Sequence, residues 1–230
     1  MPKAIKRRVQ TKTSDTEQEV KDRLTIIKDN IKERKKTAYQ AGIIIVVLIA
    51  ALTGFFIYNH TSQKKAARLA QEASLIYYSE IPGQPAEDRY KKALEMFRQA
   101  NNTKASPASL FYIAGCLYEL GKYDEALSTL LDFTRKYANE DKYIPLAYQK
   151  IAMVHLKKGD EPGAMKALDT LSGLKGSIYK DFVLLEQARL LEKSGKTEEA
   201  KKKYKDLADK FPDSPFSGEA KAKLSEKKEG

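Results

Sequence analysis

Hydrophobic and polar positions divide the chain into three kinds of segment. In the charged stretch before residue 38, apolar residues recur at helical spacing, at Val20, Leu24, Ile27 and Ile31. An unbroken apolar run follows, and from there to the end of the chain apolar residues again return with a helical period. No segment shows the strict alternation of a half-buried strand. The pattern predicts an all-α protein with a tail, one apolar helix and a larger helical domain.

The apolar run, "AYQAGIIIVVLIAALTGFFIY" over residues 38–58, has no charged residue in 21 positions. As a helix it would be about 32 Å long, enough to span a hydrocarbon core. A buried core helix of this length would need cover on every side. A cleaved signal peptide is not expected, because 37 residues precede the run and no small-residue cleavage site follows it. The sequence therefore predicts a transmembrane helix in contact with membrane lipid.

The net charge of +11 would on its own suggest a nucleic acid or an acidic membrane surface as partner. Residues 1–37, however, hold 12 Lys and Arg against 6 Asp and Glu, so +6 of the +11 is local, and no nucleic-acid partner is expected. Residues 21–36 carry seven basic residues, whereas residues 59–74 carry three. The positive-inside rule then places the 1–37 tail in the cytoplasm and residues 59–230 across the membrane.

The basic tail is itself expected to be helical. Ser14 is followed three residues later by Glu17, which is a capping-box pattern, and the apolar stripe begins just after it. Three interpretations stay open for this helix. It is a stalk that continues into the membrane helix, a short coiled coil, or a contact with the cytoplasmic face of another membrane protein.

After the membrane run, one pattern occurs three times: a glycine followed five residues later by an alanine. The pairs are Gly121 with Ala126, Gly159 with Ala164, and Gly195 with Ala200. A glycine in the left-handed conformation can end one helix, and the alanine then lies early in the next. Seven residues before each glycine stands another small residue: Ala114, Ala152 and Ala188. Each unit is therefore predicted to be a helical hairpin whose helices approach closely at these alanines.

These spacings, with Pro212 in "FPDSP", resemble the tetratricopeptide repeat. The resemblance implies a solenoid of three to four repeats, at about residues 66–104, 107–140, 145–178 and 181–213, with a cap at 214–226. The first unit is degenerate, since Asp88 stands where the others have glycine. Spacings of 38 (159 − 121) and 36 (195 − 159) exceed the usual 34, so the surplus is expected in loops between hairpins.

The residues offer little for catalysis. His60 and His155 cannot form a metal cluster with the single Cys116, and His155 is expected to be a packed helix residue. The glycines are hairpin turns and not a phosphate loop. No enzymatic activity, metal or cofactor is predicted, and one cysteine excludes a disulfide framework within the chain.

In tetratricopeptide proteins the first helices of the hairpins line a concave protein-binding groove. The resemblance assigns to that groove Phe111, Gly115, Tyr118, Glu119, Leu146, Gln149, Met153, Leu156, Phe182, Leu185 and Arg189. This surface is mostly apolar and aromatic. The Lys/Asn set that holds a terminal carboxylate in chaperone-cofactor repeats is absent, so that specificity is not expected. Alternatively, the apolar set packs against the N-terminal helix or a second copy, which would make a homo-oligomer.

The overall plan is similar to the YfgM-like family of bacterial inner-membrane proteins. The segments that carry this resemblance are "EQEVKDRLTIIKDN", the apolar run, and "QKKAARLAQEAS". It implies a periplasmic scaffold or chaperone-like adaptor that works near the Sec translocon and with periplasmic chaperones. Two other functions stay open. The "FPDSPFSGEAKAKL" ending also resembles scaffolds for cell-envelope assembly, and a helical tail inside could transmit a signal from outside.

Overall fold

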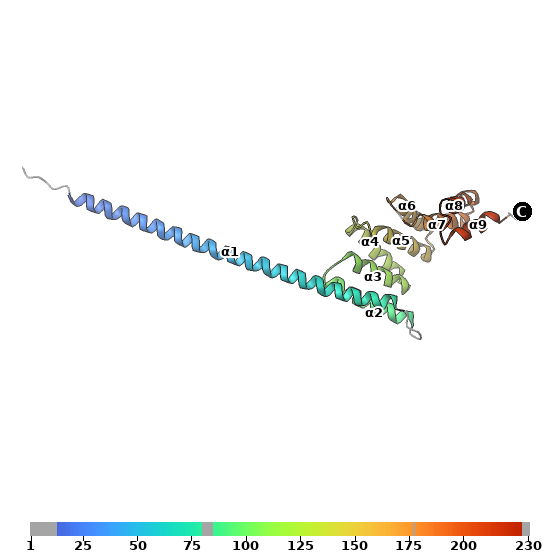
Figure 1. Cartoon of the computed structure of the whole chain (residues 1–230), viewed down its shortest axis with the longest axis horizontal. Helices are drawn as coiled ribbons and strands as arrows, with labels where there is room; N and C mark the ends of the chain where they lie inside the picture. The colour runs from blue at the N-terminus through green and yellow to red at the C-terminus, as the bar shows by residue number, and fades with distance from the viewer. Residues whose placement is uncertain (1–12, 80–84, 177, 227–230) are drawn as a thin grey trace, which may run out of the picture. The chain divides into compact units, whose positions relative to one another are not determined.

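The chain is described by a computed structural model covering residues 13–79, 85–176 and 178–226, with side chains from residue 18. This part contains helices and no strand, so the all-α class is confirmed. The chain divides into two units, Met1–His60 and Thr61–Gly230. The helices in Figure 1 are α1 (Thr13–Tyr78), α2 (Ala86–Thr103), α3 (Pro107–Glu119), α4 (Tyr123–Lys136), α5 (Ile144–Lys158), α6 (Glu161–Gly173), α7 (Lys180–Lys193), α8 (Thr197–Lys210) and α9 (Ser217–Ser225).

Helix α1 is one uninterrupted helix that contains residues 13–37 of the tail, the apolar run and the expected first helix of the first repeat. Residues 13–78 contain no proline, so every backbone N–H after the first turn can donate within the helix. The side chains of the expected capping pair, Ser14 and Glu17, lie outside the described residues. The stripe from Val20 to Ile31 is therefore continuous in backbone with the apolar run.

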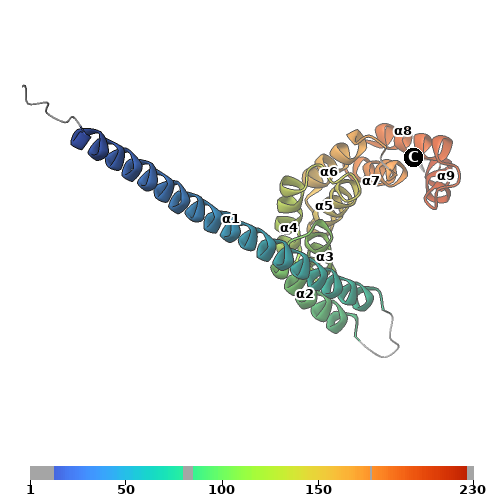
Figure 2. The same cartoon turned by 60° about the vertical axis from the view of Figure 1, so that its left-hand side comes forward.

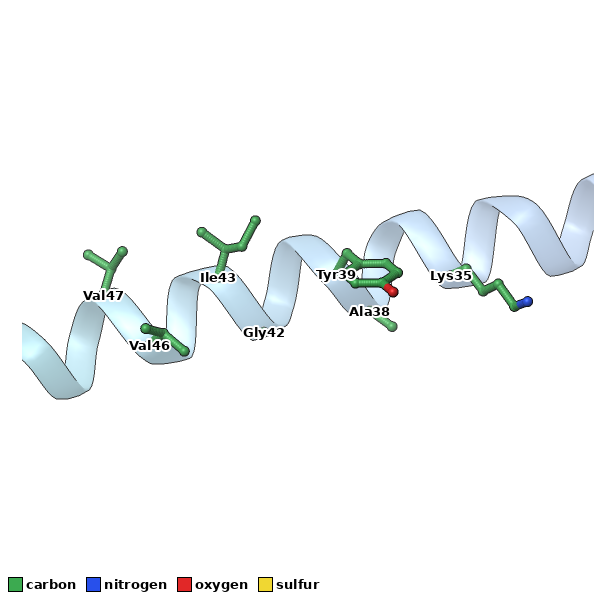
Figure 3. Close-up of a pocket in the computed structure, with 7 residues that line it drawn as sticks. All are labelled: Lys35, Ala38, Tyr39, Gly42, Ile43, Val46 and Val47. Carbon is green, nitrogen blue, oxygen red and sulfur yellow. The ribbon is translucent and has the colours of Figure 1, made fainter.

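Within the first unit, the apolar run is exposed along its whole length. Its most apolar 18-residue window has a mean hydropathy of 2.6, and none of that window is buried. Figure 3 shows the run near its N-terminal end, where Tyr39, Ile43, Val46 and Val47 project from the helix and Gly42 has no side chain. Among the described residues, α1 alone is long and apolar enough to cross a membrane, by length and composition only.

The second unit is a stack of helical hairpins. Helix α3 packs against α4, α5 against α6, and α7 against α8. Contacts of α4 with α5 and of α6 with α7 join successive hairpins, and α9 packs on α8. Figure 2 shows these helices following one another in an arc. The surplus residues lie in the connections 137–143 and 174–179, between hairpins.

The three hairpin turns share one hydrogen-bonding scheme. Gly121, Gly159 and Gly195 have φ of 72°, 72° and 76°, in the left-handed region. In the first turn the Gly121 N–H donates to the Tyr118 carbonyl at 3.0 Å, and the Lys122 N–H donates to the Leu117 carbonyl at 2.9 Å. The same pair of bonds recurs at the other two glycines. This Schellman arrangement ends each first helix and turns the chain back at once.

The hairpin alanines are all buried. Five of the six have no exposed surface and Ala200 has 2%; they are Ala114, Ala126, Ala152, Ala164, Ala188 and Ala200. The large residues four positions after the second-helix alanines are buried with them, namely Leu130, Leu168 and Tyr204. In the degenerate first repeat, Ala93 and Phe97 of α2 are also fully buried. Close helix contact at small residues thus recurs through the stack.

The apolar core of the stack is divided in two. The larger cluster runs from Ala73 to Leu190, and the smaller one is made of Leu185, Ala188, Ala200, Tyr204, Leu207 and Ala220. Helix α7 contributes to both. Val183 and Leu190 belong to the larger cluster, whereas Leu185 and Ala188 belong to the smaller.

Candidate protein-binding groove

A hollow of about 350 Å³ lies where α3, α5 and α7 meet. Its lining residues are Tyr118, Met153, Leu156, Lys157, Phe182, Glu186 and Arg189. We call this set the inner groove. Five of its members, all except Lys157 and Glu186, are among the residues that the sequence assigns to a groove. Three consecutive hairpins contribute side chains to it.

The floor of the inner groove is apolar. Met153, Leu156 and Phe182 are half-buried, and all three pack against the larger core cluster. Tyr118 is 9% exposed, and its ring lies 5.7 Å from that of Tyr123 between centroids. Met153, Leu156 and Phe182 contact the core on one side and are partly exposed on the other, which is the geometry of a contact surface, whereas Tyr118 is almost fully buried beside them.

Charged groups around the groove are mostly paired within the chain. Lys150 Nζ lies 4.7 Å from the centroid of the Tyr118 ring and 4.0 Å from Glu119 Oε1. Burial lowers the pKa of Lys150, and the Glu119 carboxylate opposes this effect. The ammonium is thus held over the aromatic face by a cation–π contact.

Arg189 is locked at the C-terminal side of the groove. Its guanidinium donates to both carboxylate oxygens of Glu219 in α9, at 2.8 and 2.6 Å, and to Glu186 Oε1 at 2.7 Å. Burial raises the pKa of Glu186, and Arg189 opposes the rise. Lys157 is exposed and makes no ion pair among the described residues.

Two of the residues predicted for the groove are buried in the packing of the stack. Leu185 is 1% exposed and belongs to the smaller core cluster, because it points from α7 toward α8. Glu186, one residue on, takes its place beside Phe182 and Arg189. These three follow at spacings of four and three residues, which keep them on one helix face. Leu185 lies at spacings of three and four from the same two residues, so helical spacing fits either position, and the repeat resemblance pointed to the buried one.

Gly115 is the second correction. It is buried, and a Cβ built on it would lie 3.3 Å from the hydroxyl oxygen of Tyr77. The space beside Gly115 is filled by the side chain of Tyr77, which belongs to a cluster of aromatic rings. The Tyr77 ring lies 5.6 Å from that of Tyr112 and 5.3 Å from that of Tyr90, between centroids. Gly115 therefore admits Tyr77 to the helix surface and presents no binding surface.

The remaining predicted residues lie outside the inner groove. Phe111 is half-buried among aromatic rings, 5.7 Å from Tyr143 and 6.2 Å from Phe133 between centroids. Leu146 and Gln149 are half-buried on α5. No sequence pattern pointed to Lys157 as a groove residue, other than its place next to Leu156.

The histidine of the second hairpin has a local role. His155 Nδ1 lies 2.7 Å from Asp160 Oδ2, and Asp160 also accepts a bond from the Gly163 N–H at 3.0 Å. The hydrogen bond from the Gly163 N–H lowers the pKa of Asp160, and the contact with His155 lowers it further. The pair thus caps α6. In the described part of the chain, no group of three or more His, Cys, Asp and Glu could hold a metal ion.

The chain resembles solved repeat structures. These include the nearly identical TPR-like repeats of a Podosopora anserina kinesin light chain, at 14% identity over 72% of this chain and 82% of that one, with a TM-score of 0.48. The TPR2AB domain of yeast Sti1 in complex with pHSP90 matches at 21% identity, over 70% and 72%, with a TM-score of 0.42. A TPR protein of Thermus thermophilus, TTC0263, matches at 16% identity, over 70% and 98%, with a TM-score of 0.38.

No curated protein matches the chain. The family model of the tetratricopeptide repeat-like domain, in contrast, matches residues 35–226, well over half of the sequence. This match agrees with the three glycine turns and the buried hairpin alanines. The chain belongs to the tetratricopeptide repeat-like family.

Proposed function

We propose that this protein is a membrane-anchored scaffold that binds polypeptide segments in its inner groove. The observation that carries the proposal is the apolar floor formed by Tyr118, Met153 and Phe182 from three successive hairpins. Aromatic and methionine side chains make adaptable contacts with apolar partners. A hollow of about 350 Å³ suits a few side chains of an extended segment better than a folded domain.

The few free charges predict what kind of segment binds. Arg189 and Lys150 are already engaged by carboxylates of the chain itself. Only Lys157 offers an unpaired charge at the rim, among the described residues. We therefore expect weak binding with little sequence specificity, driven by apolar contact, and no requirement for a terminal carboxylate.

The apolar run of α1 supports the membrane anchor in this proposal. It has the length of a membrane span, carries no charge, and is not buried in the first unit. The excess of basic residues before it supports a cytoplasmic N-terminus. The repeat unit would then be exported, and the YfgM-like arrangement supports a periplasmic site near the Sec translocon and its chaperones.

Site-specific photocrosslinking in cells tests the groove. Photoreactive residues in place of Tyr118 and Met153 should capture other proteins, whereas the matched control at Lys202, exposed on α8, should not. Capture only of a second copy, or of the chain's own Thr61–Tyr78 segment, would make the groove a structural joint. The client-binding function would then be abandoned.

A further inference from the structure

The tail part of α1 carries an apolar stripe that nothing in the first unit covers. Val20, Leu24, Ile27 and Ile31 are 51–59% exposed, and they follow at spacings of four, three and four residues. At 100° per residue these positions fall on one narrow face of the helix. This is the seam geometry of a helix that packs against another helix.

The charges beside the stripe are mostly basic. On a helical projection, the charged positions within 90° of its centre are Glu17, Lys21, Arg23, Lys28, Arg34 and Lys35. None of the five basic residues forms an ion pair with another residue whose side chain is described. The acidic residues Asp22, Asp29 and Glu33 lie on the opposite side of the helix. The stripe is therefore an apolar seam whose flanks carry a net positive charge, with Arg23 and Lys28 on its two sides.

A second copy of this chain fits the stripe poorly. Two copies anchored in one membrane have the same orientation, so their tails could pair only in parallel. In a parallel pair with this seam, Arg23 of one copy would face Lys28 of the other across the edge of the seam. Like charges at such positions destabilise the pair.

The membrane surface also fits poorly. Because α1 is unbroken, the tail extends away from the bilayer when residues 38–58 cross it. Leu24 then lies 14 residues from Ala38, about 21 Å along the helix axis. Attraction to anionic lipid falls off within a Debye length of about 8–10 Å. Of the five basic residues beside the stripe, only Arg34 and Lys35 would be close to headgroups.

We propose that the stripe binds an amphipathic helix of another protein, one whose apolar seam is flanked by Glu and Asp. Apolar contact along the seam supplies affinity, and pairing of the acidic flanks with Arg23 and Lys28 supplies specificity. This inference rests on the membrane anchor proposed above, which fixes the orientation of the tail.

Binding of designed peptides to the full-length protein in nanodiscs of phosphatidylcholine tests this directly. The two fluorescein-labelled probes are helical 21-residue peptides with leucine at the seam and either Glu or Lys at every flanking position. The Glu-flanked peptide should bind at least tenfold more tightly than the Lys-flanked one. Leu24→Asp should weaken binding at least tenfold. Equal affinity of the two peptides would overturn the proposal.

A charge reversal gives the sharper test. Arg23→Glu with Lys28→Glu should make the protein prefer the Lys-flanked peptide. Lys32→Glu with Lys36→Glu changes the net charge equally but away from the stripe, so the original preference should remain. If both double variants behave alike, the attraction is nonspecific and the seam is not a docking site.

Single tryptophans separate this proposal from the anchor, because the chain has no tryptophan of its own. In nanodiscs with brominated acyl chains, fluorescence of Leu48→Trp should be quenched and that of Ile27→Trp should not. Loss of quenching at position 48 would overturn the anchor. Quenching at both positions would leave the anchor intact and overturn the stripe, which would then lie in lipid. Disulfide-linked dimers of Leu24→Cys, made in a Cys116→Ala background, would assign the stripe to a second copy.

Discussion

A Cβ on Gly115 of α3 would lie 3.3 Å from the hydroxyl oxygen of Tyr77 of α1. A larger side chain would push Tyr77 out of its contact with Tyr90 and Tyr112. We expect Gly115→Leu to destabilise the repeat unit by about 2 kcal/mol, even after the gain in helix propensity of about 1 kcal/mol. Urea unfolding of the Thr61–Gly230 fragment measures this.

Gly218 provides the matched control for that substitution. It lies in α9, and a Cβ there meets nothing within 4 Å. Gly218→Ala should be neutral or slightly stabilising. Unchanged stability of Gly115→Leu would mean that the contact with Tyr77 is dispensable.

Ala164 tests the hairpin contact. It has no exposed surface where α5 and α6 approach, so Ala164→Glu would insert both volume and an unpaired charge. We expect a loss of about 3 kcal/mol or more in thermal unfolding of the same fragment. Lys166→Glu, two residues on and exposed, should change stability by less than about 0.5 kcal/mol. Equal tolerance of the two changes would show that the hairpin register is wrong.

Because of Cys116, the free energy of unfolding is expected to fall at alkaline pH. The thiol has no exposed surface, and burial raises its pKa to about 12. Since the unfolded thiol ionises near pH 8.5, the unfolded state loses its proton first, and stability falls as pH rises above that value. Wild type should therefore lose about 2 kcal/mol relative to Cys116→Ala between pH 8 and 10. The free energy of unfolding of both proteins is measured with denaturant across this range. An equal change with pH in wild type and Cys116→Ala would show that burial does not shift the ionisation of the thiol.

The Arg189–Glu219 pair is expected to hold α9 on the stack. Arg189→Lys keeps the charge but loses the two-pronged bond, so α9 should open more easily, by about 1 kcal/mol. Hydrogen exchange of the α9 amides reports this opening. Arg135→Lys, which affects a highly exposed pair with Asp132 on α4, should leave exchange unchanged. Equal protection of α9 in both variants would contradict a role for the pair.

Topology tests the proposed localisation. A reporter that is active only outside the cytoplasm should be active when fused after Gly230 and inactive when fused before Met1. Reversing the flank charges, with Arg34, Lys35 and Lys36 all changed to Glu, should reduce correct insertion. The opposite reporter pattern in the unaltered protein would rule out a periplasmic repeat unit.

The hairpins could be predicted because their signals are local. A glycine such as Gly121 marks a left-handed turn, and an alanine such as Ala126 marks close helix contact, whatever lies elsewhere in the chain. The family match and the all-helical fold agree with these signals. Uninterrupted continuation of the apolar run into the first repeat helix was not predicted, because the absence of proline permits a continuous helix but does not require one.

The groove was harder to predict because it depends on small rotations between stacked helices. Leu185 and Glu186 are neighbours on α7, yet a turn of 100° sends one into the core and brings the other to the groove. The repeat resemblance assigned Leu185 to the groove, and helical spacing from Phe182 and Arg189 fits either residue. Gly115 differs again, because the residue that covers it, Tyr77, is 38 positions earlier (115 − 77), and no pattern in the sequence links the two.

The two faces of α7 belong to different apolar clusters, so no single core extends through the stack. Each hairpin is stable mainly through its immediate neighbours, and the last one, α7 with α8, has another hairpin on one side only. The C-terminal end should therefore open without the rest, in a separate cooperative step. For this protein a single midpoint of unfolding would average over two events, and the repeat unit should behave as a chain of coupled modules.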